Sequence, residues 1–240
     1  MILSSGCLEP PAVERQDDLP TYICRRAPVA PLIDGKADDR AWLRADRARL
    51  VLADGSGEPV QATTFRALWT DRHLYILFEC VDDDVWAGYT RHDDKLYEQE
   101  VVEVFLNENG DRKAYVEIEV SPNNATFDAL ILNPGGGKRF KGLLDYECEG
   151  LQTAVRVDGT PGTQRARGRG DDRGWTVELA VPFDQLILAR NRPPLRGDRW
   201  CWNVYRIDRG GEKGEFTCWS PVRRPSFHTP ERFGFLVFEK

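Results

Sequence analysis

The stretch Leu96-Tyr-Glu-Gln-Glu-Val-Val-Glu-Val-Phe-Leu-Asn107 decides the fold. In its second half the side chains alternate, with Val102 and Val104 pointing to one side of the chain. Glu103 and Phe105 point to the other side. A period of two residues is typical of a β-strand with one face on a hydrophobic core. The sequence therefore predicts a strand whose second face is free for another purpose.

A second alternating stretch, Tyr115-Val-Glu-Ile-Glu-Val120, follows closely. The linker Glu108-Asn-Gly-Asp111 contains the Asn-Gly pair that is typical of a turn between antiparallel strands. If the two strands pair, Glu103, Phe105 and Glu117 share one patch. Carboxylates and aromatic rings together suit a sugar, because its C–H faces stack on rings and its hydroxyls donate to carboxylates. An ordinary solvated sheet face is the alternative.

Length and composition are those of a soluble globular protein. The chain has 240 residues, of which 41% are hydrophobic and 30% charged. The net charge of −6 argues against nucleic acid as a partner, because phosphate binding needs a basic surface. No apolar run approaches the roughly 18–20 residues of a membrane-spanning helix. We expect a monomer without a transmembrane segment.

The order of apolar stretches and turns predicts an all-β protein. Residues 1–20 are polar and proline-bearing, which is typical of a tail or linker. Residues 21–240 contain about twelve short strands and little helix. This pattern predicts an antiparallel β-sandwich of jelly-roll type. The side chains expected to be buried include Trp42, Val102, Val104, Ile118 and Val177.

The six cysteines contain no C-x-x-C pair, which argues against zinc and thioredoxin-type chemistry. Cys201 and Cys218 flank a predicted hairpin, so a disulfide and two buried thiols are alternatives. The start of the chain, up to Cys7, ends like a bacterial lipoprotein cleavage site without a full hydrophobic region. A lipid anchor at Cys7 and a chance match are both open. We expect a secreted or cell-envelope protein, with the cytoplasm as the alternative.

Two further features are candidate ligand sites. The acidic run Asp82, Asp83 and Asp84 follows a predicted strand and offers oxygen ligands for a cation, with a solvated turn as the alternative. Trp86 lies in the loop that leads to the opening stretch, and His228 lies in a Phe-His-Thr-Pro segment. His228 either lines a ligand site or makes hydrogen bonds only within its own loop.

Five motifs stand in the order found in one known family. They are Ile33-Asp-Gly35 with Trp42, Leu68-Trp-Thr-Asp71, Tyr97-Glu-Gln-Glu-Val-Val-Glu-Val-Phe105, Gly174-Trp-Thr-Val-Glu-Leu-Ala-Val-Pro182 and Phe233-Gly234. Together they resemble family 9 carbohydrate-binding modules, DOMON-related β-sandwiches first known as appendages of xylanases. The resemblance covers residues 28–240, and the ending resembles stand-alone bacterial proteins of this group.

The resemblance implies a sugar site. In the family, two aromatic residues sandwich the terminal sugar of a glycan, and acidic and amide groups hold its hydroxyls. Tyr97 and Phe233 correspond to the two aromatic residues, and Glu103 corresponds to a hydroxyl-binding glutamate. Both aromatic positions are tryptophan in the family, so the smaller rings imply weaker or different sugar binding. The family also carries structural calcium, for which the acidic runs are candidates; no other cofactor is required.

The sequence thus predicts non-catalytic carbohydrate binding. The candidate ligand-binding residues are Tyr97, Glu103, Phe233, Phe105, Glu117, Trp86 and His228. A glycoside hydrolase is the first alternative, because Glu117 and Glu119 share a strand face. A haem-binding DOMON-type module is the second, although Met1 is the only methionine and the histidines stand in no motif. A structural envelope protein without sugar binding is the third.

Overall fold

The structure is a computed structural model and describes residues 18–135, 138–162, 172–210 and 214–239. These residues form β-strands, loops and short 3₁₀ turns. The strands are β1 (Thr21–Arg26), β2 (Ala48–Arg49), β3 (Val51–Leu52), β4 (Thr63–Trp69), β5 (His73–Val81), β6 (Val101–Asn107), β7 (Ala114–Val120), β8 (Thr126–Leu132), β9 (Lys141–Leu143), β10 (Gln152–Asp158), β11 (Gly174–Pro182), β12 (Arg199–Asp208), β13 (Glu215–Cys218) and β14 (Gly234–Glu239). The 3₁₀ turns are η2 (Arg40–Arg44), η3 (Leu96–Glu98), η4 (Phe183–Gln185) and η5 (Pro230–Arg232).

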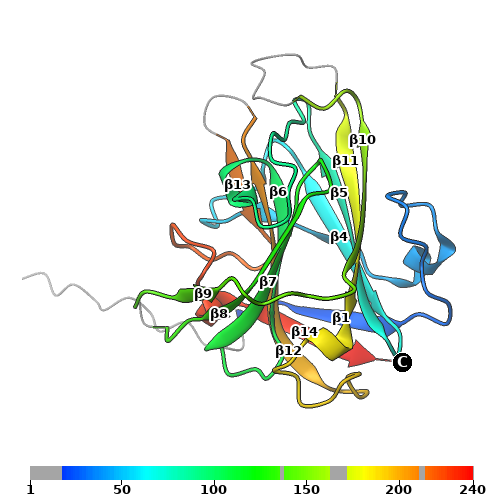
Figure 1. Cartoon of the computed structure of the whole chain (residues 1–240), viewed down its shortest axis with the longest axis vertical. Helices are drawn as coiled ribbons and strands as arrows, with labels where there is room; N and C mark the ends of the chain where they lie inside the picture. Colours follow the sequence, from blue (N-terminus) through cyan, green and yellow to red (C-terminus); the bar gives the residue numbers. More distant parts are fainter. Residues whose placement is uncertain (1–17, 136–137, 163–171, 211–213, 240) are drawn as a thin grey trace, which may run out of the picture.

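The strands belong to one curled sheet (Figure 1). Its main path runs β10-β11-β5-β4-β1-β14-β12-β6-β7-β8-β9. The all-β prediction is confirmed, with 14 strands in place of about twelve. The neighbours are antiparallel except at β1, which pairs in parallel with both β14 and β4. The sheet is therefore mixed, and the expectation of a purely antiparallel arrangement is wrong at this strand.

The main hydrophobic core lies between the two halves of the curled sheet. Residues of β4, β5 and β11 meet residues of β6, β7 and β12 in one cluster. Val102, Val104, Ile118 and Val177 belong to this cluster. They and Trp42 are at most 1% exposed, so their predicted burial is confirmed.

The second face of β6 and β7 is also covered. Phe105 and Tyr115 lie in a second hydrophobic cluster that includes Tyr205 and Phe233. The predicted alternation is correct, but the predicted free face is wrong. Loop segments that precede β6 and β14 contribute residues to this cluster and close over the face. Any polar side chain of β6 or β7 on this side is therefore placed in a dry environment.

A buried glutamate fastens the segment before β2 to the sheet. Glu178 of β11 accepts a hydrogen bond from Trp42 Nε1 at 2.8 Å through its Oε1. Its Oε2 accepts from the backbone N–H groups of Asp34 and Gly35, each at 2.9 Å. Gly35 has φ = +79°, a conformation that favours glycine. Asp39 caps η2 by accepting from the backbone N–H of Ala41, which sets Trp42 against β11.

The cysteines of β12 and β13 are free thiols. Cys201 and Cys218 are both buried and unbridged. Cys218 pairs with Tyr205, which lies four residues beyond Cys201 along β12. Four residues of strand span about 13 Å, far beyond the reach of a disulfide. The disulfide alternative is therefore wrong.

Two expectations concern the membrane. Among the described residues, no helix has the length and apolar character needed to cross a bilayer. The lipid anchor expected at Cys7 lies outside the described residues.

We expect Glu178→Ala to lower the free energy of unfolding by about 2–4 kcal/mol, because three donors lose their acceptor and a buried unpaired donor costs about 1–3 kcal/mol. Urea denaturation of both proteins measures the change. Glu58→Ala, at an exposed glutamate, is the control and should stay within about 0.5 kcal/mol of the parent protein. An unchanged urea midpoint for Glu178→Ala would contradict the anchoring role of this carboxylate.

Candidate functional site

A pocket of about 550 Å³ opens beside η3, above the second face of β6 and β7. Its lining includes Tyr97 of η3, Glu103 of β6, Glu117 of β7 and His228. These four are all among the predicted ligand-binding residues. The volume lies within the range of roughly 300–1,000 Å³ that is usual for small-molecule sites.

Aromatic rings form much of the wall of this pocket. Tyr97 is 40% exposed and meets Phe127 edge-on, with ring centroids 6.2 Å apart. Phe140 and Phe216 also line the pocket and are exposed to a similar degree. Phe227 lies in the same lining and stacks on Tyr205 at 4.3 Å between centroids. The pocket therefore offers accessible ring surface from several segments that are distant in sequence.

His228 forms part of the wall on one side of the pocket. Its ring stacks on Phe140 with centroids 3.7 Å apart and on Phe105 at 5.2 Å. Burial lowers the pKa of His228 to about 4, so the ring is neutral at pH 7. Asn133 donates to the Tyr115 hydroxyl, which leaves that hydroxyl to donate to His228 Nδ1 at 2.8 Å. This assignment places the His228 proton on Nε2, as a hydrogen-bond donor.

Three buried glutamates form the floor of the pocket and the layer behind it. Glu103 and Glu119 are directly opposite each other across the β6–β7 pair, and Glu117 precedes Glu119 by two residues on the same face. Each offers a carboxylate oxygen within 4.8 Å of the others. Burial raises the pKa of Glu117 to about 7 and the pKa values of Glu103 and Glu119 well above the usual range. The cluster therefore holds protons at neutral pH.

Three predicted site residues do not reach this pocket. Phe233 is fully buried against Phe105 and Tyr115, with its centroid 5.1 Å from that of Tyr115. The predicted pairing of Tyr97 and Phe233 across a cleft is therefore wrong. Phe105 is also fully buried and stacks on His228, with ring centroids 5.2 Å apart. Trp86 is buried beside the second acidic centre, where its backbone N–H donates to Glu100 at 3.1 Å.

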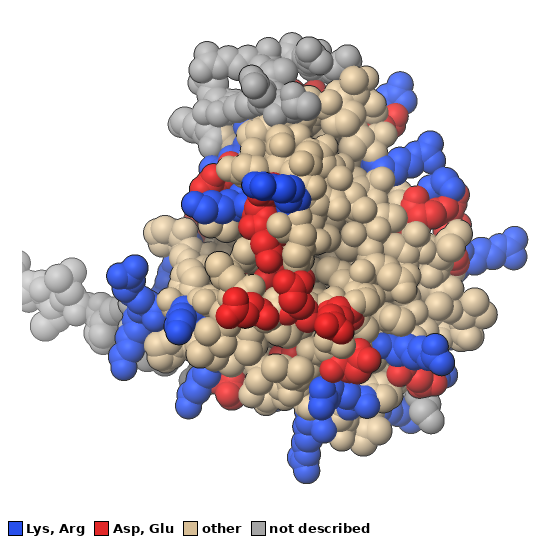
Figure 2. Space-filling view, in the orientation of Figure 1, with Lys and Arg blue, Asp and Glu red and all other residues tan. Residues whose placement is uncertain are grey.

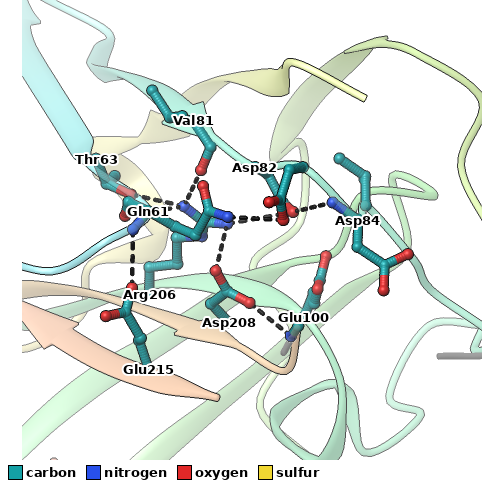
Figure 3. Close-up of polar contacts among 12 residues, drawn as sticks. Gln61, Thr63, Val81, Asp82, Asp84, Glu100, Arg206, Asp208 and Glu215 are labelled. Carbon is teal, nitrogen blue, oxygen red and sulfur yellow. Dashed lines mark hydrogen bonds and ion pairs between the residues drawn. The ribbon is translucent and has the colours of Figure 1, made fainter. Parts of the chain in front are cut away.

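This second acidic centre consists of Asp82, Glu100 and Asp208 around Arg206, and it joins the ends of β5, β6 and β12 (Figure 3). Arg206 donates through Nη2 to Asp82 at 2.7 Å and to Asp208 at 3.2 Å. Its Nη1 donates to the carbonyl of Val81 at 2.7 Å. Glu100 lies alongside, and its carboxylate comes within 4.8 Å of those of both aspartates. One guanidinium thus faces three buried carboxylates.

The predicted acidic run is only partly included in this centre. Asp82 is a member, and the backbone N–H of Asp84 donates to it at 3.0 Å. Asp83 is exposed and accepts from Gln61, outside this centre. Glu100 and Asp208 are members that sequence reasoning missed, although both stand at the ends of predicted strands.

A larger pocket of about 690 Å³ lies elsewhere on the molecule, over β4, β5 and β11. Two of its carboxylates are already ion-paired: Glu79 with Arg47 at 3.1 Å and Arg66 at 3.2 Å, and Asp158 with Arg173 at 3.6 Å. The third, Glu58, is exposed. Trp175, the one aromatic residue among the described residues that line it, is buried, so this pocket lacks the accessible ring surface of the Tyr97 pocket.

Comparison with known proteins assigns the family. The sequence profile described as "Carbohydrate family 9 binding domain-like" matches residues 33–240. The chain belongs to this family. The predicted resemblance is therefore confirmed. Family 9 chains also include modules of larger enzymes, and several relatives of this chain are of that kind.

Two relatives of this family 9 chain differ in how much of their own length the match covers. An extracellular protein of Arthroderma benhamiae is 26% identical over 187 residues, which cover 75% of this chain and 80% of the relative. The exoglucanase XynX of Acetivibrio thermocellus is 29% identical over 211 residues, covering 86% of this chain. The match spans only 16% of the enzyme's length.

Solved structures share the fold of this family 9 chain. A candidate carbohydrate-binding protein of Bacteroides uniformis superposes with a TM-score of 0.73 at 19% identity, covering 91% of this chain and 99% of that one. A family 9 module of Caldicellulosiruptor kristjanssonii, solved in complex with cellotriose, gives a TM-score of 0.63 at 17% identity. That match covers 92% of this chain and 94% of the module.

The glutamate cluster should make this protein less stable as the pH rises. An unfolded glutamate has a pKa of about 4.3, whereas that of Glu117 in the folded chain is about 7. Between these values the folded chain keeps a proton that the unfolded chain releases. The stabilisation is fully present below about pH 4 and is lost towards pH 7, by roughly 1 kcal/mol per pH unit for each proton.

Urea unfolding between pH 4.5 and pH 7 measures this loss. We expect Glu117→Gln to flatten the decline, because a glutamine cannot release the proton. Glu58→Gln, which changes an exposed glutamate, should keep the slope of the parent protein. Equal slopes for the parent and Glu117→Gln would contradict proton retention at the pocket floor.

Proposed function

We propose that this chain binds carbohydrate without catalysis, in the Tyr97 pocket. One observation carries the proposal: exposed aromatic rings stand over buried carboxylates in a single pocket. Aromatic rings and carboxylates are the two groups that a sugar needs. Two relatives support the choice of ligand, because one family 9 module is solved with cellotriose and another relative is an exoglucanase.

The affinity expected from these contacts is modest. Stacking a sugar ring on Tyr97 should contribute on the order of 1 kcal/mol beyond its buried area, by analogy with aromatic pairs. Because the glutamates hold protons at neutral pH, a hydroxyl that hydrogen-bonds to a neutral carboxyl group contributes about 0.5–1.5 kcal/mol, and more where the carboxyl group is ionised. The loss of translational and rotational freedom offsets much of this gain, so we expect micromolar to millimolar dissociation constants.

The placement of the carboxylates favours binding over hydrolysis. Glycoside hydrolases place two carboxyl groups on either side of the scissile bond, separated by about 5–5.5 Å or more. Glu103, Glu117 and Glu119 instead come from one sheet face and crowd together behind the same side of the pocket. A sugar can rest on them but cannot lie between them.

The acidic surface argues against a nucleic-acid partner, and one relative supports a setting outside the cell. Figure 2 shows a streak of acidic side chains across one face, with basic side chains towards the rim. Such a surface does not favour nucleic acid. A related chain is described as an extracellular protein, and we propose that this chain also meets its glycan outside the cell.

We expect Tyr97→Ala and Glu103→Gln each to weaken glycan binding at least about tenfold, because each removes one of the two kinds of contact. A glycan array followed by calorimetry measures the change. Tyr97→Phe keeps the ring and should lose less than Tyr97→Ala. Glu58→Gln should bind as the parent does. Unaltered binding by both Tyr97→Ala and Glu103→Gln would place the site elsewhere.

We also propose a structural calcium at the Arg206 centre. The residues there fit the ion, because Glu100 Oε1 is buried without a hydrogen-bond partner among the described residues. Burial raises the pKa of Glu100 to about 10, which shows how poorly the centre accepts another negative charge. Calcium prefers carboxylate oxygens. Asp82, Glu100 and Asp208 would hold it and join the ends of three strands.

Removing calcium should therefore destabilise the protein. At a calcium concentration about 100-fold above the dissociation constant, binding adds about 2.7 kcal/mol to the free energy of unfolding. Thermal unfolding with calcium and with a chelator measures the difference, which Glu100→Gln should reduce. Asp83→Asn is the control and should retain the calcium effect. A melting temperature that is the same with calcium and with chelator would leave this centre as a plain ion-pair network.

A further inference from the structure

The glutamate cluster beneath the Tyr97 pocket contains three carboxyl groups, more than the described cations around it could neutralise if all three were ionised. Glu103, Glu117 and Glu119 are each at least 95% buried. Among the described residues, Glu103 Oε1 is buried without a hydrogen-bond partner. Buried polar atoms are normally paired, so this oxygen at the pocket floor indicates a missing donor. The three carboxylates approach one another within 4.8 Å, where three like charges cannot all persist in a dry site.

One guanidinium belongs to the same pocket. Arg209 lines it, donates to the backbone carbonyl of Tyr97 at 3.2 Å and lies over the Phe216 ring at 4.8 Å. Even if its full charge acts on Glu103, one cation stands against three carboxyl groups among the residues that the structure describes. A ligand that brings a second cation and several N–H donors would restore the balance.

We propose that the sugar bound in this pocket is an amino sugar, with its free ammonium group set against Glu103 and Glu117. This inference rests on the proposed carbohydrate function. An ammonium carries three donors and no acceptor, which matches a floor that offers only acceptors when ionised. The sugar ring then lies against Tyr97, and the neighbouring aromatic faces add cation–π attraction for the charge.

A metal ion suits the pocket less well than an ammonium. Calcium takes six to eight oxygen ligands, whereas the walls around the glutamates consist largely of rings and aliphatic side chains such as Phe127, Ile131 and Leu144. An ammonium needs only the two or three carboxylates at the floor. An uncharged sugar brings no cation, so with it the glutamates must keep their protons, whereas an ammonium group allows them to ionise.

Selectivity among three monosaccharides tests the proposal. Calorimetry at pH 7 with chelator present compares glucosamine, glucose and N-acetylglucosamine, which differ in the group at one ring carbon. We expect glucosamine to bind at least about tenfold more tightly than the other two. Acetylation removes the charge, so N-acetylglucosamine should behave like glucose. Glu117→Gln should bring the three affinities within about threefold, and Glu58→Gln should preserve the preference.

The outcomes separate this inference from the function on which it rests. Equal binding of the three sugars that is lost in Tyr97→Ala would overturn the amino-sugar inference and keep carbohydrate binding. Binding that requires calcium would also overturn it. Failure of the parent protein to bind any sugar, here and on a glycan array, would overturn both. The comparison among sugars uses the parent protein, so it decides the matter even if Glu117→Gln does not fold.

Discussion

The burial of both faces of β6 and β7 is the constraint on which the rest of the structure depends. One face supplies Val102, Val104 and Ile118 to the main core, and the other supplies Phe105 and Tyr115 to a second cluster. A strand buried on both faces leaves no wet side for its polar residues. The glutamates that alternate with the aromatic residues are therefore held in a dry layer, where a carboxylate is costly unless it is paired or protonated.

This constraint explains why sequence patterns located the site but misjudged its environment. The alternation placed Glu103 and Glu117 together correctly, because strand periodicity is a local property. Whether a face is solvated depends on loops distant in sequence, and periodicity does not report them. The Phe227-His228 segment, which comes from another part of the chain, closes one side of the pocket. The parallel pairing of β1 with β14 is equally non-local, since it joins the two ends of the described chain.

Sequence patterns also predicted only part of the aromatic lining of the pocket. Tyr97 was located by its motif and does line the pocket, whereas Phe233 does not. Gly234 follows Phe233 so tightly against Trp219 and the Pro20 carbonyl that a β-carbon would come within 2.6 Å of both. The close packing fixes the backbone path at Gly234, and the Phe233 ring packs into the second hydrophobic cluster. Phe227, in the same terminal segment, takes the wall position instead. Composition alone does not distinguish these two phenylalanines.

The two acidic centres differ in whether a side-chain cation of the described chain is hydrogen-bonded to their carboxylates. At the Arg206 centre, Arg206 bonds to Asp82 and Asp208 at the ends of strands, away from the Tyr97 pocket, so these charges act within the fold. Among the described residues, no side-chain cation is hydrogen-bonded to the glutamates under Tyr97, and Glu103 and Glu117 border a pocket of about 550 Å³. Removing one partner of such a buried ion pair destabilises a fold, because it leaves the other charge unpaired. Carboxylates that the fold leaves without donors, at the base of an open pocket, instead favour whichever ligand supplies those donors.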